Sequence, residues 1–274
     1  MSTDSVIANR STSASARPLD GHHAVVTGGG RGIGAAISAN LAERGANITL
    51  MGRTLDTLEA YKAVLEADHG ATVACVSVDV TDEASVEAGF AQAAETLGAP
   101  QILVNNAGRG DSMPFKRMDR DFLQRMVDMN LTSAFLCIRQ ALPAMTEAGY
   151  GRIVTVASTA GLIGYRYVSA YVPSKHAVIG LTRSLALETA KTGVTVNAVC
   201  PGYVETDMTQ DTIDNIVRKT GCTPDEAFAQ LAATNPQGRL IAPAEVANAV
   251  SWLALPDSHS ITGQAIPIAG GEVM

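Results

Sequence analysis

The chain has 274 residues, of which 46% are hydrophobic and 17% charged, so it is long enough to bury a large core. Its net charge of -7, without a basic stripe, argues against nucleic acid as a partner. No apolar run reaches the ~18 residues of a membrane helix, and we expect a cytoplasmic protein.

The cysteines are spread singly along the chain, without a CxxC pair. Three of them lie in apolar runs where a small hydrophobic residue would serve. Free thiols in a reducing compartment are therefore expected, with no metal site. These residues are Cys75, Cys137, Cys200 and Cys222.

The first nineteen residues are rich in Ser, Thr and Ala and include two arginines. This composition faintly resembles an organelle transit peptide. Asp4 and the lack of an amphipathic stripe favour a disordered extension or a cloning remnant instead. We therefore expect residues 1–19 to lie outside the fold and one domain to span residues 20–274.

From His23 onward, short β-branched runs alternate with longer segments of helical periodicity. The expected strands are residues 24–27, 47–51, 71–78, 102–105, 152–158, 194–200 and 264–268. The expected helices are residues 32–43, 55–69, 84–97, 120–148, 171–191 and 244–255. This alternation predicts an α/β fold with a doubly wound, Rossmann-type sheet of seven parallel strands in a single domain.

One segment does not fit the alternation. Residues 203–240 are mostly polar and helical, and they follow the carboxyl end of a predicted strand. Ligands of doubly wound sheets bind at that end of the strands. The sequence therefore predicts a lid over the ligand crevice at about residues 203–240.

The first predicted strand joins the first helix through the sequence VVTGGGRGIG, residues 25–34. Gly28, Gly32 and Gly34 follow the spacing TGxxxGxG, which allows a tight turn and a close approach of the backbone to a pyrophosphate. The unpaired N–H groups at a helix N-terminus favour such an anion. A strand before the turn and a helix after it make this a predicted nucleotide site.

Arg53 lies at the end of the second predicted strand, in TLMGRTL, where an acidic residue would bind the ribose 2′-hydroxyl of NAD. Two interpretations are open. Arg53 is a solvated loop residue, or it binds the 2′-phosphate of NADP together with Arg31 from the glycine turn. Thr54 either adds a hydroxyl contact or caps the next helix.

The sequence YVPSK places Tyr171 and Lys175 on one face of a predicted helix. Hydride transfer to a ketone creates an alkoxide that needs a proton, and the reverse reaction needs a base. A lysine ammonium one turn away, together with the positive nicotinamide ring of an oxidised cofactor, is expected to lower the pKa of the tyrosine from ~10 toward 7. Ser158, at the end of the fifth strand, is expected to orient the carbonyl oxygen, and Asn130 to hold a water that links Lys175 to solvent.

These motifs, together with NNAG at residues 105–108, resemble the short-chain dehydrogenase/reductase family over nearly all of residues 20–274. Asn130, Ser158, Tyr171 and Lys175 match the catalytic tetrad of that family. The resemblance implies a Rossmann-type fold, a nicotinamide cofactor and a homotetramer. Within the family, the motifs look most like those of 3-oxoacyl-thioester reductases and aromatic polyketide ketoreductases.

The resemblance also assigns the expected binding residues. Asp79 matches an aspartate that holds the adenine, and CPGYVET contains the motif that contacts the nicotinamide carboxamide. The expected cofactor-binding residues are Thr27, Gly28, Arg31, Gly32, Ile33, Gly34, Arg53, Thr54, Asp79, Val80, Asn106, Ala107, Gly108, Tyr171, Lys175, Pro201, Gly202, Val204 and Thr206. The expected substrate residues are Arg109, Leu162, Tyr165 and Tyr203.

We therefore expect an NADP(H)-dependent oxidoreductase that interconverts a ketone and a secondary alcohol. The first candidate substrate is a 3-oxoacyl thioester of the coenzyme A type, or a similar medium-sized apolar carbonyl compound. Reductases that use a carrier protein tend to have basic residues where this chain has Leu136 and Leu187. A dehydrogenase of a cyclic or steroid-like alcohol stays open, as does a non-catalytic NADP-binding redox sensor.

Overall fold

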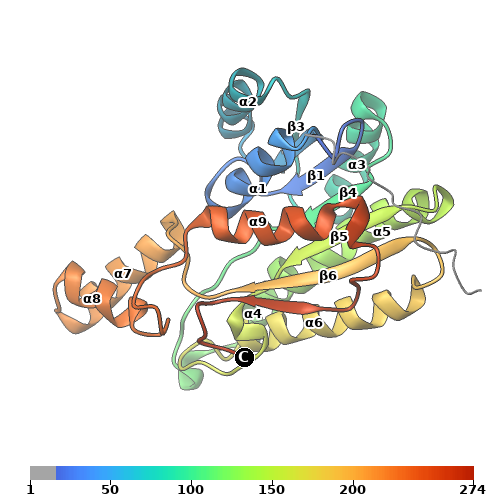
Figure 1. Ribbon diagram of the computed structural model, residues 1–274. Coiled ribbons are helices and arrows are strands. Elements are labelled where there is room, and N and C mark those ends of the chain that lie inside the picture. The colour runs from blue at the N-terminus through green and yellow to red at the C-terminus, as the bar shows by residue number, and fades with distance from the viewer. Residues whose placement is uncertain (1–16) are drawn as a thin grey trace, which may run out of the picture.

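The computed structural model describes residues 17–274, so most of the predicted N-terminal extension lies outside the described residues. Seven parallel strands form one sheet in the order β3-β2-β1-β4-β5-β6-β7 (Figure 1). The strands are β1 (His23–Thr27), β2 (Asn47–Gly52), β3 (Val73–Ser77), β4 (Ile102–Asn105), β5 (Gly151–Val156), β6 (Val194–Pro201) and β7 (Ala265–Ile268). The strand order reverses between β1 and β4, which confirms the doubly wound fold and puts the ligand crevice at their carboxyl ends.

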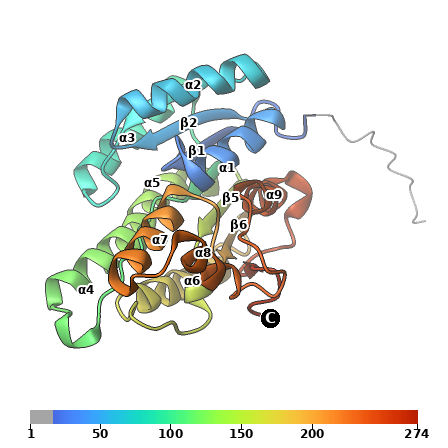
Figure 2. The same ribbon diagram turned by 90° about the vertical axis from the view of Figure 1, so that its left-hand side faces the viewer.

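Helices cover both faces of the sheet (Figures 1 and 2). Apolar residues of α1 (Gly32–Glu43), α2 (Leu55–His69) and α9 (Pro243–Ala254) pack in one buried cluster with strand residues. Residues of α3 (Glu83–Leu97), α5 (Ser133–Glu147) and α6 (Tyr171–Glu188) pack in a second. β1, β5 and β6 are buried along their whole length because both faces are covered.

The predicted long helix over residues 120–148 is interrupted. It consists of α4 (Arg120–Val127), a π-helical turn (Asp128–Thr132) and α5. In the turn, the Ser133 N–H bonds to the carbonyl of Asp128, five residues earlier. The Asn130 side chain also donates to the Met126 carbonyl oxygen, and such side-chain competition perturbs a helix.

The N-terminal boundary of the fold differs from the prediction. Leu19 is fully buried, and its N–H donates to the carbonyl of Arg44 at 2.9 Å. Residues 17–19 therefore belong to the domain, because the core needs Leu19 beside α1 and β2. Within the described part of the chain, no helix has the length and apolarity to cross a membrane.

Residues 203–240, called the lid segment below, contain α7 (Asp207–Thr220) and α8 (Pro224–Ala232). They extend beyond the end of β6, to the side of the sheet (Figure 1). Ile213, Ala227, Leu231 and Leu240 form a small buried cluster of their own, with Tyr203 packed against it. The lid segment thus has its own apolar core at the carboxyl side of the sheet.

Candidate active site

The crevice begins where β1 and β4 end. The Thr27 hydroxyl accepts hydrogen bonds from the backbone N–H groups of Asn106 and Ala107, each at 3.0 Å. The Asn106 amide donates to the carbonyls of Thr27 and Gly28 at 2.9 and 3.2 Å. These bonds join the two strand ends at the switch point, so the side chains of Thr27 and Asn106 shape the crevice wall.

The glycine turn lies beside this wall. Gly28 has a φ of 65°, which favours glycine, and a Cβ added to Gly34 would overlap the carbonyl oxygen of Gly28. No side chain caps the start of α1, and its first turn carries no acidic residue. Unpaired helical N–H groups therefore face the turn, and the predicted Gly32, Ile33 and Gly34 fit a cofactor diphosphate.

Arg31 and Arg53 are both exposed, and neither side chain has an ion pair or hydrogen bond with any other residue in 17–274. Thr54 is the N-cap of α2, but its hydroxyl caps nothing, so the predicted capping alternative is not observed. Two guanidinium groups without a partner among residues 17–274 therefore follow the carboxyl ends of β1 and β2.

Asp79 follows β3 in the same region. Its Oδ1 accepts from the N–H and hydroxyl of Thr81 at 2.9 and 2.7 Å. These bonds hold the pKa of Asp79 below its ordinary value, and the nearby charge of Arg53 acts in the same direction. The next residue, Val80, is buried against α3. The carboxylate is thus ionised, and its other oxygen has no partner within the described chain.

The start of the lid segment comes back to the glycine turn. A Cβ added to Gly32 would lie 3.4 Å from the Thr206 methyl group. The preceding residues run from the end of β6, and the Val204 carbonyl accepts from the Thr209 hydroxyl at 2.6 Å. The structure therefore brings the predicted Thr206 to the glycine turn, and Pro201, Gly202 and Val204 connect it to the end of β6.

The predicted tetrad converges near Gly108. A Cβ added to Gly108 would lie 3.0 Å from Asn130 Oδ1 and 3.5 Å from Lys175 Nζ. Tyr171 begins α6, and Lys175 follows one turn later with Nζ 5.8 Å from the tyrosine ring centre. Ser158 follows β5 and caps the 3-10 turn Thr159–Gly161 by accepting from the Ala160 N–H. One face of α6 thus meets the ends of β4 and β5.

In the protein without its cofactor, the pKa of Tyr171 lies above its ordinary value. Burial raises that pKa to about 12, and the nearby Ser158 hydroxyl lowers it only in part. Burial also lowers the pKa of Lys175 to about 8. Lys175 Nζ donates to the Val156 carbonyl oxygen at 2.9 Å. Desolvation is the largest influence on the pKa of both groups.

The side chain of Asn130 makes three hydrogen bonds within the protein. Its Nδ2 donates to the carbonyls of Arg109 and Met126, both at 2.9 Å, and its Oδ1 accepts from the Arg109 N–H at 3.1 Å. The buried amide therefore holds the loop after β4 against the π-helical turn. It leaves at most one lone pair of Oδ1 for a water.

The predicted substrate residues differ in their surroundings. Arg109 is exposed and paired with Asp111 at 2.8 Å. Leu162 is half-buried against residues of α6 and β6. Tyr203 packs on the lid segment, and the Tyr165 hydroxyl lies 2.6 Å from Oε1 of Glu272.

The sequence prediction did not include Glu272. The one available signal was a carboxylate directly after Gly270 and Gly271, at the end of the last strand. Its partner Tyr165 is 107 positions away, so the pair was not visible from local spacing.

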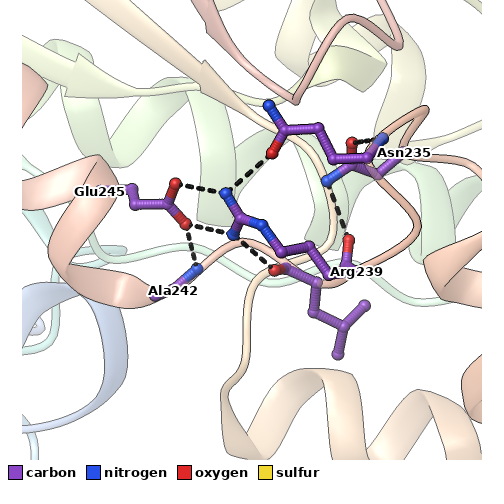
Figure 3. A network of polar contacts seen from close by, with 6 residues as sticks. Asn235, Arg239, Ala242 and Glu245 are labelled. Carbon is purple, nitrogen blue, oxygen red and sulfur yellow. Dashed lines mark hydrogen bonds and ion pairs between the residues drawn. The ribbon is translucent and has the colours of Figure 1, made fainter.

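A polar network fixes the end of the lid segment to α9 (Figure 3). Arg239 forms two hydrogen bonds with the Glu245 carboxylate, at 2.7 and 2.8 Å. Glu245 also accepts from the Ala242 N–H, and the Asn235 amide donates to the Arg239 carbonyl. The arginine holds the pKa of Glu245 well below its usual range, at about 2. The lid segment is thus anchored to the sheet domain by an ion pair.

The four cysteines are free, as predicted. In the described residues, no three His, Cys, Asp or Glu side chains are grouped so that they could hold a metal ion.

Comparison with known proteins assigns the chain to a family. Residues 22–217 match the model of the short chain dehydrogenases. A D-beta-hydroxybutyrate dehydrogenase of Rhizobium meliloti is 36% identical over 255 residues, which cover 90% of this chain and 97% of that protein. A 3-oxoacyl-(acyl-carrier-protein) reductase of Vibrio cholerae is 38% identical over 256 residues, covering 93% of this chain and 99% of that one.

A solved structure supports the same assignment. A variant of actinorhodin polyketide ketoreductase, crystallised with NADPH, superposes with a TM-score of 0.89 at 36% identity and covers 94% of this chain and 98% of that one. The chain therefore belongs to the short-chain dehydrogenase family. It is an oxidoreductase that acts on ketones and alcohols.

Proposed function

We propose that the protein is an NADP(H)-dependent reductase of a 3-oxoacyl thioester of the coenzyme A type, or of a similar medium-sized apolar carbonyl compound. The observation that carries this proposal is the arrangement of residues that follow the carboxyl ends of the strands: Tyr171, Lys175 and Ser158 come together beyond β4 and β5, and the unpaired arginines Arg31 and Arg53 follow β1 and β2. It is further proposed to work in the cytoplasm as a homotetramer.

Each part of the crevice has a proposed share in holding the cofactor. The N–H groups at the start of α1 bind the diphosphate, and Arg31 and Arg53 bind the 2′-phosphate with charge-assisted hydrogen bonds. Asp79 accepts from the adenine through its unpartnered oxygen, and Lys175 holds the ribose hydroxyls. The residues after β6, up to Thr206, contact the carboxamide. The nicotinamide supplies or accepts the hydride.

Tyr171 is the proposed proton donor in ketone reduction. Burial keeps its hydroxyl protonated, as the donor of a proton to a developing alkoxide must be. Ser158 donates a hydrogen bond to the same oxygen and orients it. For alcohol oxidation the phenolate must be stabilised, and this requires positive charge beyond what the protein alone supplies. The positive ring of the oxidised cofactor is of the right sign.

The substrate class is argued from the lining of the crevice and from relatives. Half-buried Leu162 and Tyr203 give an apolar wall, which suits a medium-sized carbonyl compound. One relative is named as a 3-oxoacyl reductase, and the superposed structure is of a polyketide ketoreductase. A dehydrogenase of a cyclic or steroid-like alcohol is the second candidate, because the polyketide enzyme's name indicates a larger substrate.

A substrate panel tests the proposal. Purified protein is mixed with a 3-oxoacyl-coenzyme A, a bicyclic ketone or a steroid ketone, each with NADPH and NADH in parallel. The expected result is NADPH-dependent reduction of the thioester, lost by ~10²–10⁴-fold in Tyr171→Phe. If the protein bound NADPH but did not oxidise it in the presence of any of these ketones, the redox-sensor alternative would be favoured.

A further inference from the structure

Glu272 lies in the substrate region although it comes from the far end of the chain. It follows β7, and the carboxyl-terminal segment ends on the side of the sheet where α6 begins (Figure 1). Its Oε2 is 2.9 Å from the position that a Cβ on Gly202 would take. Gly202 lies between the end of β6 and Tyr203, the first residue of the lid segment, so the carboxylate adjoins the predicted substrate wall.

A short chain of hydroxyl groups holds the Glu272 side chain in place. The Tyr165 hydroxyl lies 2.6 Å from Oε1 of Glu272 and 2.8 Å from the Thr159 hydroxyl. A carboxylate can only accept, so the single tyrosine proton goes to Glu272 and the Thr159 hydroxyl donates to Tyr165. Thr159 directly follows Ser158. The carboxylate is thereby coupled to the turn that carries a catalytic residue.

The negative charge of Glu272 is not neutralised. No Lys, Arg or His of the described chain lies within 4.0 Å of its carboxylate. Its charge raises the pKa values of Tyr165 and Tyr203, for both of which burial is the larger cause. Tyr203 in turn is close enough to Tyr171 to affect its pKa. The charge of Glu272 therefore acts on Tyr165 and Tyr203, the two predicted substrate tyrosines.

We infer that Glu272 is a specificity-determining residue that excludes substrates with a carboxylate near the reacting carbonyl and favours uncharged ones. Oε2 has no hydrogen-bond donor among residues 17–274 and can accept a hydrogen bond from a hydroxyl group of such a substrate. A fixed like charge within several ångströms disfavours a second carboxylate by about tenfold or more. This inference rests on the proposed function and narrows it. A relative named for hydroxybutyrate suggests an acid, whereas Glu272 favours a neutral ester or thioester.

The test compares two substrates that differ in one charge, 3-oxobutyrate and its ethyl ester. The measured quantity is the ratio of kcat/KM for the acid to that for the ester, with NADPH. Glu272→Gln keeps an oxygen that can accept from Tyr165 but removes the charge. We expect this variant to raise the ratio about tenfold over wild type. A ratio within twofold of wild type would overturn the inference.

A matched control is Glu95→Gln, which removes the same charge from an exposed site on α3. It should leave both rates unchanged. If the wild-type protein reduces neither compound, the proposed substrate class has failed. In that case ligand affinity is measured in place of kcat/KM. The NADP⁺-loaded proteins are then titrated with butyrate and butyramide. Glu272→Gln should raise relative butyrate affinity about tenfold, and an unchanged affinity ratio overturns the inference.

Discussion

The ammonium group of Lys175 donates to the carbonyl oxygen of Val156, at the last residue of β5. This bond ties the helix that carries Tyr171 to the strand that leads to Ser158. It uses one of the three N–H donors of the ammonium group and leaves two for other partners. In the protein alone, burial therefore sets the pKa of both groups, about 12 for Tyr171 and about 8 for Lys175.

The first prediction concerns the phenolate of Tyr171. The ultraviolet difference between wild type and Tyr171→Phe is measured against pH. Because burial raises the pKa of Tyr171 to about 12, the cofactor-free difference should show no phenolate up to pH ~10. With NADP⁺ bound, positive charge beside the phenol should bring the signal to lower pH. A phenolate at pH 8 without cofactor would contradict the pKa set by burial.

The second prediction concerns cofactor choice. Arg53→Asp replaces an unpaired guanidinium with a group that repels phosphate and can accept from a ribose hydroxyl. The ratio of kcat/KM with NADPH to that with NADH is expected to fall by ~10- to 1000-fold. Arg31→Ser should lower this ratio as well, because it should raise the KM for NADPH. Arg117→Asp, an exposed arginine beside α4, is the control. If Arg53→Asp and Arg117→Asp gave the same NADPH-to-NADH ratio, Arg53 would not bind the 2′-phosphate of NADP.

The positions of the strands along the chain and most helix bounds were predictable because each depends on local periodicity. The glycines after β1 lie close to one another in the sequence, so one turn was enough to place them together. Tyr171 and Lys175 are four residues apart, so one helix face was enough to place that pair. The TGxxxGxG turn needed only the strand before it and the helix after it. Local chemistry thus predicted the fold and the main groups of the crevice.

What the sequence could not predict depends on contacts between distant segments. The π-helical turn accompanies the bonds of Asn130 to both Met126 and Arg109, twenty-one residues apart in the second case. The Tyr165–Glu272 pair joins a loop after β5 to the chain end. The pKa values of Tyr171 and Lys175 depend on burial by the whole fold, which a spacing of four residues does not contain.

The third prediction concerns assembly. Leu187 on α6 is 82% exposed and Phe135 on α5 is 44% exposed, so neither packs against the sheet, unlike Ile138 and Ala186 beside them. If α5 and α6 pair with their symmetry mates, Phe135→Asp and Leu187→Asp should break the tetramer into smaller species. Val64→Asp, 44% exposed on α2, is the matched control and should not. Light scattering after size exclusion measures this, and a 28.4 kDa wild-type particle would rule the tetramer out.

The fourth prediction concerns the anchor of the lid segment. Glu245→Gln removes the charge that pairs with Arg239 and weakens the acceptor for the Ala242 N–H at the start of α9 (Figure 3). Because both side chains are more than a third exposed, solvent screens the pair, and the melting temperature should fall by only about 1–3 °C at pH 7. Glu226→Gln is the matched control, because Glu226 is the third residue of α8 as Glu245 is of α9, and it forms no ion pair among the described residues. It should lower the melting temperature less.

The pH dependence gives the sign of this contribution. The folded-state pKa of Glu245 is about 2, below its ordinary value of 4.5, so the pair stabilises the fold fully above pH ~4.5 and loses its effect as the pH falls toward 2. The difference in melting temperature between wild type and Glu245→Gln should therefore stay constant from pH 7 to 5 and shrink below 4.5. If this difference in melting temperature grew as the pH fell, the ion pair of Glu245 with Arg239 would not be the cause of the difference. Thermal unfolding at a series of pH values, with Glu226→Gln in parallel, measures it.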